Sequence, residues 1–122
     1  MARITHFDIS ADDADRAIQF HEAVFGWKFK KWDIPGMNYW MIATGEGPGI
    51  DGGMGIKSES EMPNMNTVDV ESVDSIVLSV KKHGGKIVSE KAPIPGIGWF
   101  AIIEDTEGNL LGVMEEDSSA GV

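Results

Sequence analysis

The sequence contains no cysteine among its 122 residues. This absence excludes a disulfide framework, a thiolate metal site and a cysteine nucleophile. Nothing in the cysteine usage indicates an oxidising compartment, so we expect a cytoplasmic protein.

Long hydrophobic runs are also missing. No apolar stretch approaches the roughly 20 residues that a helix needs to cross a bilayer. The opening stretch, MARITHFDIS, lacks the apolar centre of a secretory signal peptide. We therefore expect a protein that is neither exported nor embedded in a membrane.

Basic side chains are few, with 10 Lys and Arg against 20 Asp and Glu, which gives a formal net charge of −10. Such a charge repels nucleic-acid phosphates and anionic lipid surfaces. We expect no nucleic acid and no membrane among the partners, and solubility is the simplest role of the acidity.

Proline is scarce as well, with five residues, whereas hydrophobic residues make up 42% of the chain. This composition is typical of a soluble globular chain that buries one ordinary core. A single domain over residues 1–122 is the expected organisation.

The sequence does contain a repeated motif. Residues 34–42 read IPGMNYWMI, and residues 94–102 read IPGIGWFAI. Each copy has a Pro-Gly turn signal, two adjacent aromatic residues and an apolar segment typical of a strand. The repeat suggests that one structural unit occurs twice.

The first half reads as β-α-β-β-β, over residues 3–57. Residues 3–10 alternate as a strand, with His6, Asp8 and Ser10 on one face. A helix follows with Asp12 or Asp13 as its cap, and Gly26 ends it. We then expect strands at 27–32 and 39–44, a glycine-rich loop from 45 to 55, and a short strand that ends near residue 57.

A polar linker at 58–66 precedes the same pattern in the second half, over residues 67–115. Ser72 caps the second helix, and residues 81–83 place cations at its C-terminus before Gly84. The expected strands cover 67–70, 86–89, 99–104 and 110–114. We expect the tail, residues 116–122, to fray.

The two halves align almost from end to end, which indicates an internal duplication. Without a gap, the alignment pairs His6 with Met65 and Gly26 with Gly85. After one inserted residue, it pairs Pro35 with Pro95, Tyr39 with Trp99, and Gly52 with Gly112.

Two further motifs are informative: the opening HFDISADDADRAIQFHEAVFGWKF and the closing EDTEGNLLGVME. With these motifs the chain resembles the vicinal oxygen chelate superfamily, which includes glyoxalases, bleomycin resistance proteins and extradiol dioxygenases. The resemblance implies an α+β fold in which two tandem βαβββ modules form a cupped mixed β-sheet, and it implies a homodimer.

In metal-using members of that superfamily, the cup carries ligands near the start of each module's first strand and on each last strand. The resemblance places His6 at the first position and Met65 or Thr67 at its repeat partner. The last-strand positions fall near Gly52 and at Gly112, although a shift of one residue would bring Asp51 into the cup. Because His6 is the one good ligand in this set, we expect no tightly bound metal.

Small-molecule contacts are expected from His6 and Asp8, which share a strand face and could act as a base and its orienting carboxylate. Among the aromatic and apolar residues, strand parity suggests that Tyr39, Met41 and Trp99 face the cleft. A structural role for each of these side chains remains the alternative.

The sequence therefore favours a protein that binds a small organic molecule in a cleft, without a cofactor. The alternative is a metal-dependent enzyme, either a lyase or isomerase of the lactoylglutathione-lyase type or a dioxygenase relative. Such an enzyme would recruit Zn, Ni, Mn or Fe through His6.

Overall fold

The computed structural model describes residues 2–33, 36–59 and 63–122. Two compact units make up the chain: residues 6–64 form the first module, and residues 65–122 with residues 1–5 form the second. Pro35, which belongs to the first predicted Pro-Gly turn, lies outside the described residues.

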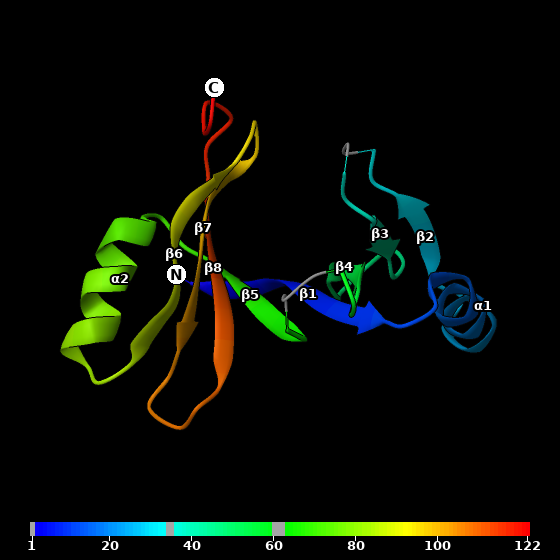
Figure 1. Cartoon of the computed structure of the whole chain (residues 1–122), viewed down its shortest axis with the longest axis horizontal. Helices are drawn as coiled ribbons and strands as arrows, with labels where there is room; N and C mark the ends of the chain where they lie inside the picture. Colours follow the sequence, from blue (N-terminus) through cyan, green and yellow to red (C-terminus); the bar gives the residue numbers. More distant parts are fainter. Residues whose placement is uncertain (1, 34–35, 60–62) are drawn as a thin grey trace. The chain divides into compact units, whose positions relative to one another are not determined.

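The first module runs strand, helix, strand, strand, strand, as the sequence predicts (Figure 1). Its elements are β1 (Arg3–Ala11), α1 (Ala14–Phe25), β2 (Lys28–Lys31), β3 (Tyr39–Ala43) and β4 (Asp51–Ile56). The first three residues of β1 are grouped with the second unit, and the rest of the strand lies in the first. The strands lie in the order β2-β3-β4-β1. Strands β1 and β4 are parallel, and the other two pairs are antiparallel.

The second module repeats this topology. Its elements are β5 (Met65–Asp69), α2 (Val73–Lys82), β6 (Lys86–Ile94), β7 (Gly98–Glu104) and β8 (Leu110–Glu116). The strands lie in the order β6-β7-β8-β5, with β5 and β8 parallel. Figure 1 shows α2 along one side of these strands. The predicted α+β fold of two βαβββ modules is confirmed.

Side-chain caps fix where both helices begin. The Asp13 carboxylate accepts a hydrogen bond from the Arg16 backbone N–H at 3.1 Å, and the Ser72 hydroxyl accepts one from the Ser75 N–H at 3.2 Å. Gly26 ends α1 with φ of 73°, a conformation that favours glycine. In the second module the corresponding left-handed residue is Gly84, so the predicted pairing of Gly26 with Gly85 is wrong by one position.

Each module buries a core between its helix and one face of its sheet. The first core contains Ala11, Ile42 and Met54, packed with Phe7, Ile9, Ala14, Ala17, Ile18, Trp27, Phe29 and Trp40. The second contains Val73, Ala101, Ile103 and Val113, packed with Val68, Val70, Ile76, Val77, Val80, Ile87, Trp99 and Leu111. We call the other face of each sheet the helix-free face.

Several predicted boundaries need correction. Strand β5 begins at Met65, inside the predicted linker 58–66, and β6 extends to Ile94, beyond the strand predicted over 86–89. Strand β4 begins at Asp51, inside the glycine-rich stretch predicted as a loop, because it pairs with β1 on one side and β3 on the other. The tail is ordered rather than frayed. Ala120 is fully buried, and its carbonyl accepts a hydrogen bond from the Gly96 N–H at 2.9 Å.

Among the described residues, neither helix has the length and apolar character needed to cross a membrane.

Candidate functional site

The helix-free face of the first module carries a row of three polar side chains. His6 and Asp8 stand two residues apart on β1, so their side chains lie on the same face. Tyr39 begins β3. Its hydroxyl donates to Asp8 Oδ1 at 2.5 Å and lies 3.2 Å from His6 Nε2. The structure thus joins Tyr39 to the His6 and Asp8 pair that the sequence had already placed on one strand face.

Asp8 anchors this row from a buried position, with 6% of its surface exposed. His6 Nε2 approaches Asp8 Oδ1 to 3.5 Å, and the His6 side chain is 31% exposed. Burial, the Asp8 charge and the hydrogen bond to Asp8 all raise the pKa of Tyr39, with burial the largest cause. Tyr39 therefore holds its proton and acts as a donor to Asp8.

The proton inventory fixes the roles within the row. A phenol carries one proton, and an ionised carboxylate only accepts hydrogen bonds. Because the Tyr39 proton points to Asp8, the Tyr39 oxygen can only accept from His6 Nε2. In a neutral His6, the tautomer that fits this arrangement carries its proton on Nε2, which leaves Nδ1 as the acceptor nitrogen.

Gly53 makes room for the Tyr39 side chain. Asp8 and Gly53 are partners in the pairing of β1 with β4, and Met41 and Gly53 are partners across β3 and β4. A Cβ built at Gly53 would overlap the Tyr39 hydroxyl and ring. Glycine at this position is therefore what allows the hydroxyl to reach Asp8.

A depression of about 260 Å³ opens beside this row. It lies within the first module and is lined by Asp8, Ile9, Ser10, Gly36, Met37, Asn38, Tyr39, Gly55 and Glu59. Sequence analysis missed the contributions of Ser10, Asn38 and Glu59. Asn38 and Glu59 stand 21 positions apart in loops, and no periodic pattern links them.

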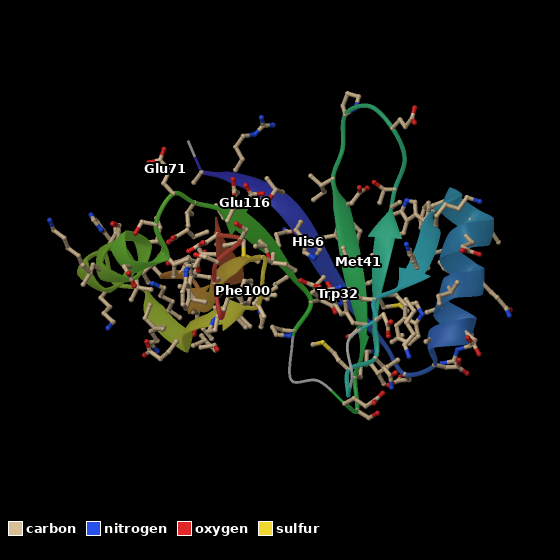
Figure 2. The ribbon with its side chains drawn as sticks, turned by 90° about the horizontal axis from the view of Figure 1, so that it is seen from above. His6, Trp32, Met41, Glu71, Phe100 and Glu116 are labelled. Carbon is tan, nitrogen blue, oxygen red and sulfur yellow. The ribbon has the colours of Figure 1, made fainter. Side chains whose placement is uncertain are left out.

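Met41 lies on the helix-free face as predicted, since its strand neighbours Trp40 and Ile42 belong to the core under α1. It is 42% exposed and can be found with His6 in Figure 2. The orientations predicted for Tyr39 and Met41 are confirmed. Whether these residues contact a ligand stays a prediction.

The orientation predicted for Trp99 is wrong. Trp99 packs against the core under α2, and its indole N–H donates to Asp117 Oδ2 at 3.0 Å. Phe100, labelled in Figure 2, is the neighbour that faces the other way, and a Cβ built at Gly112 would meet its ring at 2.8 Å. The second-module counterpart of Tyr39 is therefore Phe100.

Strand register explains why the orientation predicted for Trp99 is wrong. Asp8 pairs with Gly53, and Thr67 pairs with Gly112, so the first and last strands of the two modules correspond at a spacing of 59 residues. Ile42 pairs with Gly52, and Ile103 pairs with Leu111, so the third strands correspond at a spacing of 61. The sequence alignment used a spacing of 59 residues for the first strands and 60 for the third and last strands. Its third-strand and last-strand pairings are each wrong by one residue, and an error of one residue reverses the face.

Comparison with known proteins agrees with this architecture. Residues 3–45 match the family described as Bleomycin resistance protein-like N-terminal. A glyoxylase-like domain-containing protein from Didymella fabae is 32% identical over 117 residues, which cover 88% of each chain. The chain belongs to the vicinal oxygen chelate superfamily.

Other members of the superfamily are more distant or longer. The protein described as "Putative glyoxylase CFP32" in Mycobacterium bovis and Mycobacterium tuberculosis is 28% identical over 114 residues, which cover 88% of this chain. The chain spans 42% of the length of those mycobacterial proteins.

Solved structures share the fold at low identity. A hypothetical protein from Bacillus halodurans C-125 has a TM-score of 0.71 at 16% identity, with 99% of each chain covered. A methylmalonyl-CoA epimerase in complex with methylmalonyl-CoA and NH4+ has a TM-score of 0.63 at 14% identity, covering 100% of this chain and 99% of the other.

The residues present do not fit a divalent metal ion of the kind that the superfamily implies. Register makes Met65 the repeat counterpart of His6. It places glycines at the last-strand positions, which are Gly112 as predicted and Gly53 rather than Gly52. Rings from Tyr39 and Phe100 lie over these glycines. Asp51 Oδ1 accepts from the Thr44 N–H at 2.9 Å. No group of three or more His, Cys, Asp or Glu that could hold a metal occurs in the described part of the chain.

Proposed function

We propose that this chain binds a small organic molecule on the helix-free face of its first module, with His6, Asp8 and Tyr39 as the polar contacts. The observation that carries the proposal is the hydrogen-bonded row of these three side chains beside a depression of about 260 Å³. A concave site with a few convergent polar groups is the usual form of a small-molecule site. The proposal requires no tightly bound metal, in keeping with the donor set.

The chemistry available to the site is polar recognition with a positioned base. Asp8 holds the Tyr39 hydroxyl, the hydroxyl accepts from His6 Nε2, and His6 Nδ1 is left to accept a proton or a hydrogen bond from the bound molecule. Met41 supplies apolar contact on the same face.

A thermal-shift screen of small metabolites and planar drugs tests the binding proposal. A ligand present at 100 times its dissociation constant stabilises the folded state by about 2.7 kcal/mol. We expect stabilisers of the wild type whose effect is reduced in Tyr39→Phe and in His6→Ala. Glu46→Gln is the control, because Glu46 is exposed on a loop of the same module and does not line the depression. If no compound stabilises the protein, or if both variants respond as the wild type does, the proposal is wrong.

The names of the relatives favour a second candidate function, a metal-dependent lyase or isomerase of the glyoxalase type. In that enzyme His6 would be a ligand of Zn, Ni, Mn or Fe. Elemental analysis of protein purified without a histidine tag separates the two candidates. Near-stoichiometric metal, together with an activity lost on chelation and in His6→Ala, would favour the enzyme and overturn the metal-free proposal.

We also propose that the chain forms a homodimer. The proposal rests on the superfamily resemblance and on large apolar side chains that the described chain leaves exposed, among them Phe20, Val24 and Leu78. Apolar surface of this kind is more often found at interfaces than on isolated monomers when it is contiguous.

A further inference from the structure

The depression beside Asp8 has an unusual hydrogen-bond inventory, because the side-chain donors that line it are already engaged inside the module. The Tyr39 hydroxyl donates to Asp8 Oδ1 at 2.5 Å. The Ser10 hydroxyl donates to Asn64 Oδ1 at 3.1 Å. Asn38 Nδ2 donates to both oxygens of Glu59, at 2.9 and 3.1 Å.

The acceptors that line the depression are less fully used. Three acceptors have no hydrogen-bond partner within the residues that the structure describes. They are Asp8 Oδ2, Asn38 Oδ1 and the lone pairs of the Ser10 hydroxyl. The Asp8 side chain is 7% exposed, so its free oxygen has little access to bulk water other than through the depression. Buried acceptors of this kind are normally matched by a donor.

The charges of the lining residues also favour a ligand that donates hydrogen bonds. Asp8 and Glu59 are the charged residues among those that line the depression, and the described lining contains no Lys, Arg or His. A carboxylate or phosphate placed there would face two negative charges, and the described lining residues would offer it no free side-chain donor. A protonated amine would instead offer N–H donors and a positive charge, and charge-assisted hydrogen bonds are the stronger kind.

From these observations we infer that the depression takes the protonated amino group of a small organic amine whose apolar body lies against Met37 and the Tyr39 ring. This inference rests on the proposed small-molecule function and names the class of molecule. Asp8 Oδ2 and Asn38 Oδ1 accept from the ammonium group, and Glu59, held by Asn38, supplies the second negative charge at the rim.

Four probes with a shared aromatic body test the inference: 2-phenylethylamine, its N,N,N-trimethyl derivative, 2-phenylethanol and 3-phenylpropionate. Titrations at about 0.15 M salt, where the Debye length is about 8 Å, limit the effect of the net charge. Binding is followed by calorimetry and by amide NMR shifts at Ser10, Asn38 and Gly55. We expect the primary amine to bind at least about tenfold more tightly than the other three probes.

Glu59→Gln should weaken binding of the primary amine by about 1.5-fold to fivefold, which is the range for an exposed charge pair. Glu46→Gln is the matched control, because Glu46 is exposed on a loop of the same module and makes the same change in net charge. We expect the control variant to bind as the wild type does.

Each other result overturns the inference. Equal binding of the trimethyl derivative would show that the site recognises positive charge without requiring N–H donors. Tighter binding of the alcohol or the carboxylate would show a different ligand class. Equal weakening by Glu46→Gln would point to the net charge of the protein. If none of the probes shifts the three amides, the amine inference fails, while the wider thermal-shift screen decides the proposed function separately.

Discussion

At the scale of single residues, the pair of Tyr39 and Asp8 shows how a buried polar contact shapes the chemistry of a site. A buried carboxylate without a donor is costly, and the Tyr39 hydroxyl supplies that donor. The same contact keeps the phenol protonated. Because this is the only tyrosine in the sequence, its ionisation can be followed by absorbance without interference from other tyrosines.

The raised pKa of Tyr39 predicts a loss of stability at high pH. The pKa of tyrosine in an unfolded chain is about 10, so above that pH the unfolded state releases a proton that the folded state keeps. The stabilisation is therefore complete below about pH 10 and is lost as pH rises, by about 1.4 kcal/mol per pH unit. Urea unfolding from pH 8 to 11 should show this slope in the wild type.

Tyr39→Phe is the control for the pH series, since it removes the titrating hydroxyl and keeps the ring. We expect its stability to fall less steeply above pH 10, with other groups contributing equally to both proteins. Tyrosinate absorbance in the wild type should rise only as the protein unfolds. Parallel pH profiles for the two proteins would contradict the buried-donor role of Tyr39.

Gly53 gives a prediction based on space rather than charge. Gly→Ala in a strand usually stabilises by about 0.4–1 kcal/mol when the backbone conformation permits it. At position 53 the added methyl overlaps the Tyr39 side chain, so we expect Gly53→Ala to destabilise by about 1–3 kcal/mol. Urea denaturation measures the change. In a Tyr39→Ala background the cost should disappear, and an equal cost in both backgrounds would show that Tyr39 is not the cause.

Sequence reasoning found part of the site at this scale. It placed His6 and Asp8 on one face because alternation along a strand is a local property, and the same parity argument worked for Tyr39 and Met41. It could not show that Tyr39 reaches Asp8, since that contact joins residues 31 positions apart and depends on an empty space above Gly53. A glycine opposite an aromatic residue is a weak signal without the register.

At the scale of elements, the helices were the most predictable parts of the chain. The structure selects Asp13 from the two candidate caps of the first helix, and Ser72 caps the second as expected. Each side chain accepts a hydrogen bond from the backbone N–H three residues further along the chain. The second helix has an additional anchor, because Glu115 Oε1 accepts from the Val73 N–H at 3.0 Å. That contact links the end of β8 to the start of α2, and it gives Glu115 a structural partner.

The Ser72 cap predicts a graded response to substitution. Ser72→Ala removes the acceptor for the Ser75 N–H and should destabilise the protein by about 0.5–2 kcal/mol. Ser72→Gly leaves that N–H accessible to water and should cost only a few tenths of a kcal/mol. Thermal or urea unfolding would measure both variants. If alanine and glycine cost the same, or if neither changes stability, the hydroxyl is not acting as a cap.

Strand β4 was the least predictable element. The run from Asp51 to Gly55 contains three glycines, which intrinsically disfavour a strand. Its partners override that preference, because β1 and β3 pair with it on both sides and place Phe7 over Gly52 and Tyr39 over Gly53. Local composition predicted a loop, and tertiary packing required residues without side chains.

At the scale of the whole molecule, the duplication produced two modules of one topology with different chemistry. Where the first module has Asp8 and Tyr39, the second has Thr67 and Phe100 in the corresponding register. Thr67 is 3% exposed, and its hydroxyl has no partner among the described residues. The polar row is thus a property of the first module, which is why the proposed site is assigned there.

The proposed homodimer predicts a sedimenting species of twice 13.2 kDa at micromolar concentration. Sedimentation velocity over a range of concentrations would measure it. Phe20→Ser and Leu78→Ser are informative variants, because each removes exposed apolar surface without touching a buried core. A species of 13.2 kDa at all micromolar concentrations would contradict the dimer.

The sequence by itself determined the order of elements, the helix caps, the duplication and the superfamily resemblance, because these depend on local periodicity and on motifs of contiguous residues. Only the tertiary structure decided which residues correspond between the modules. The first and last strands match at one spacing and the third strands at another, and a strand exposes alternate residues on opposite faces. For that reason Phe100, and not Trp99, is the counterpart of Tyr39, and the polar row beside Asp8 became visible only once β3 and β4 were paired.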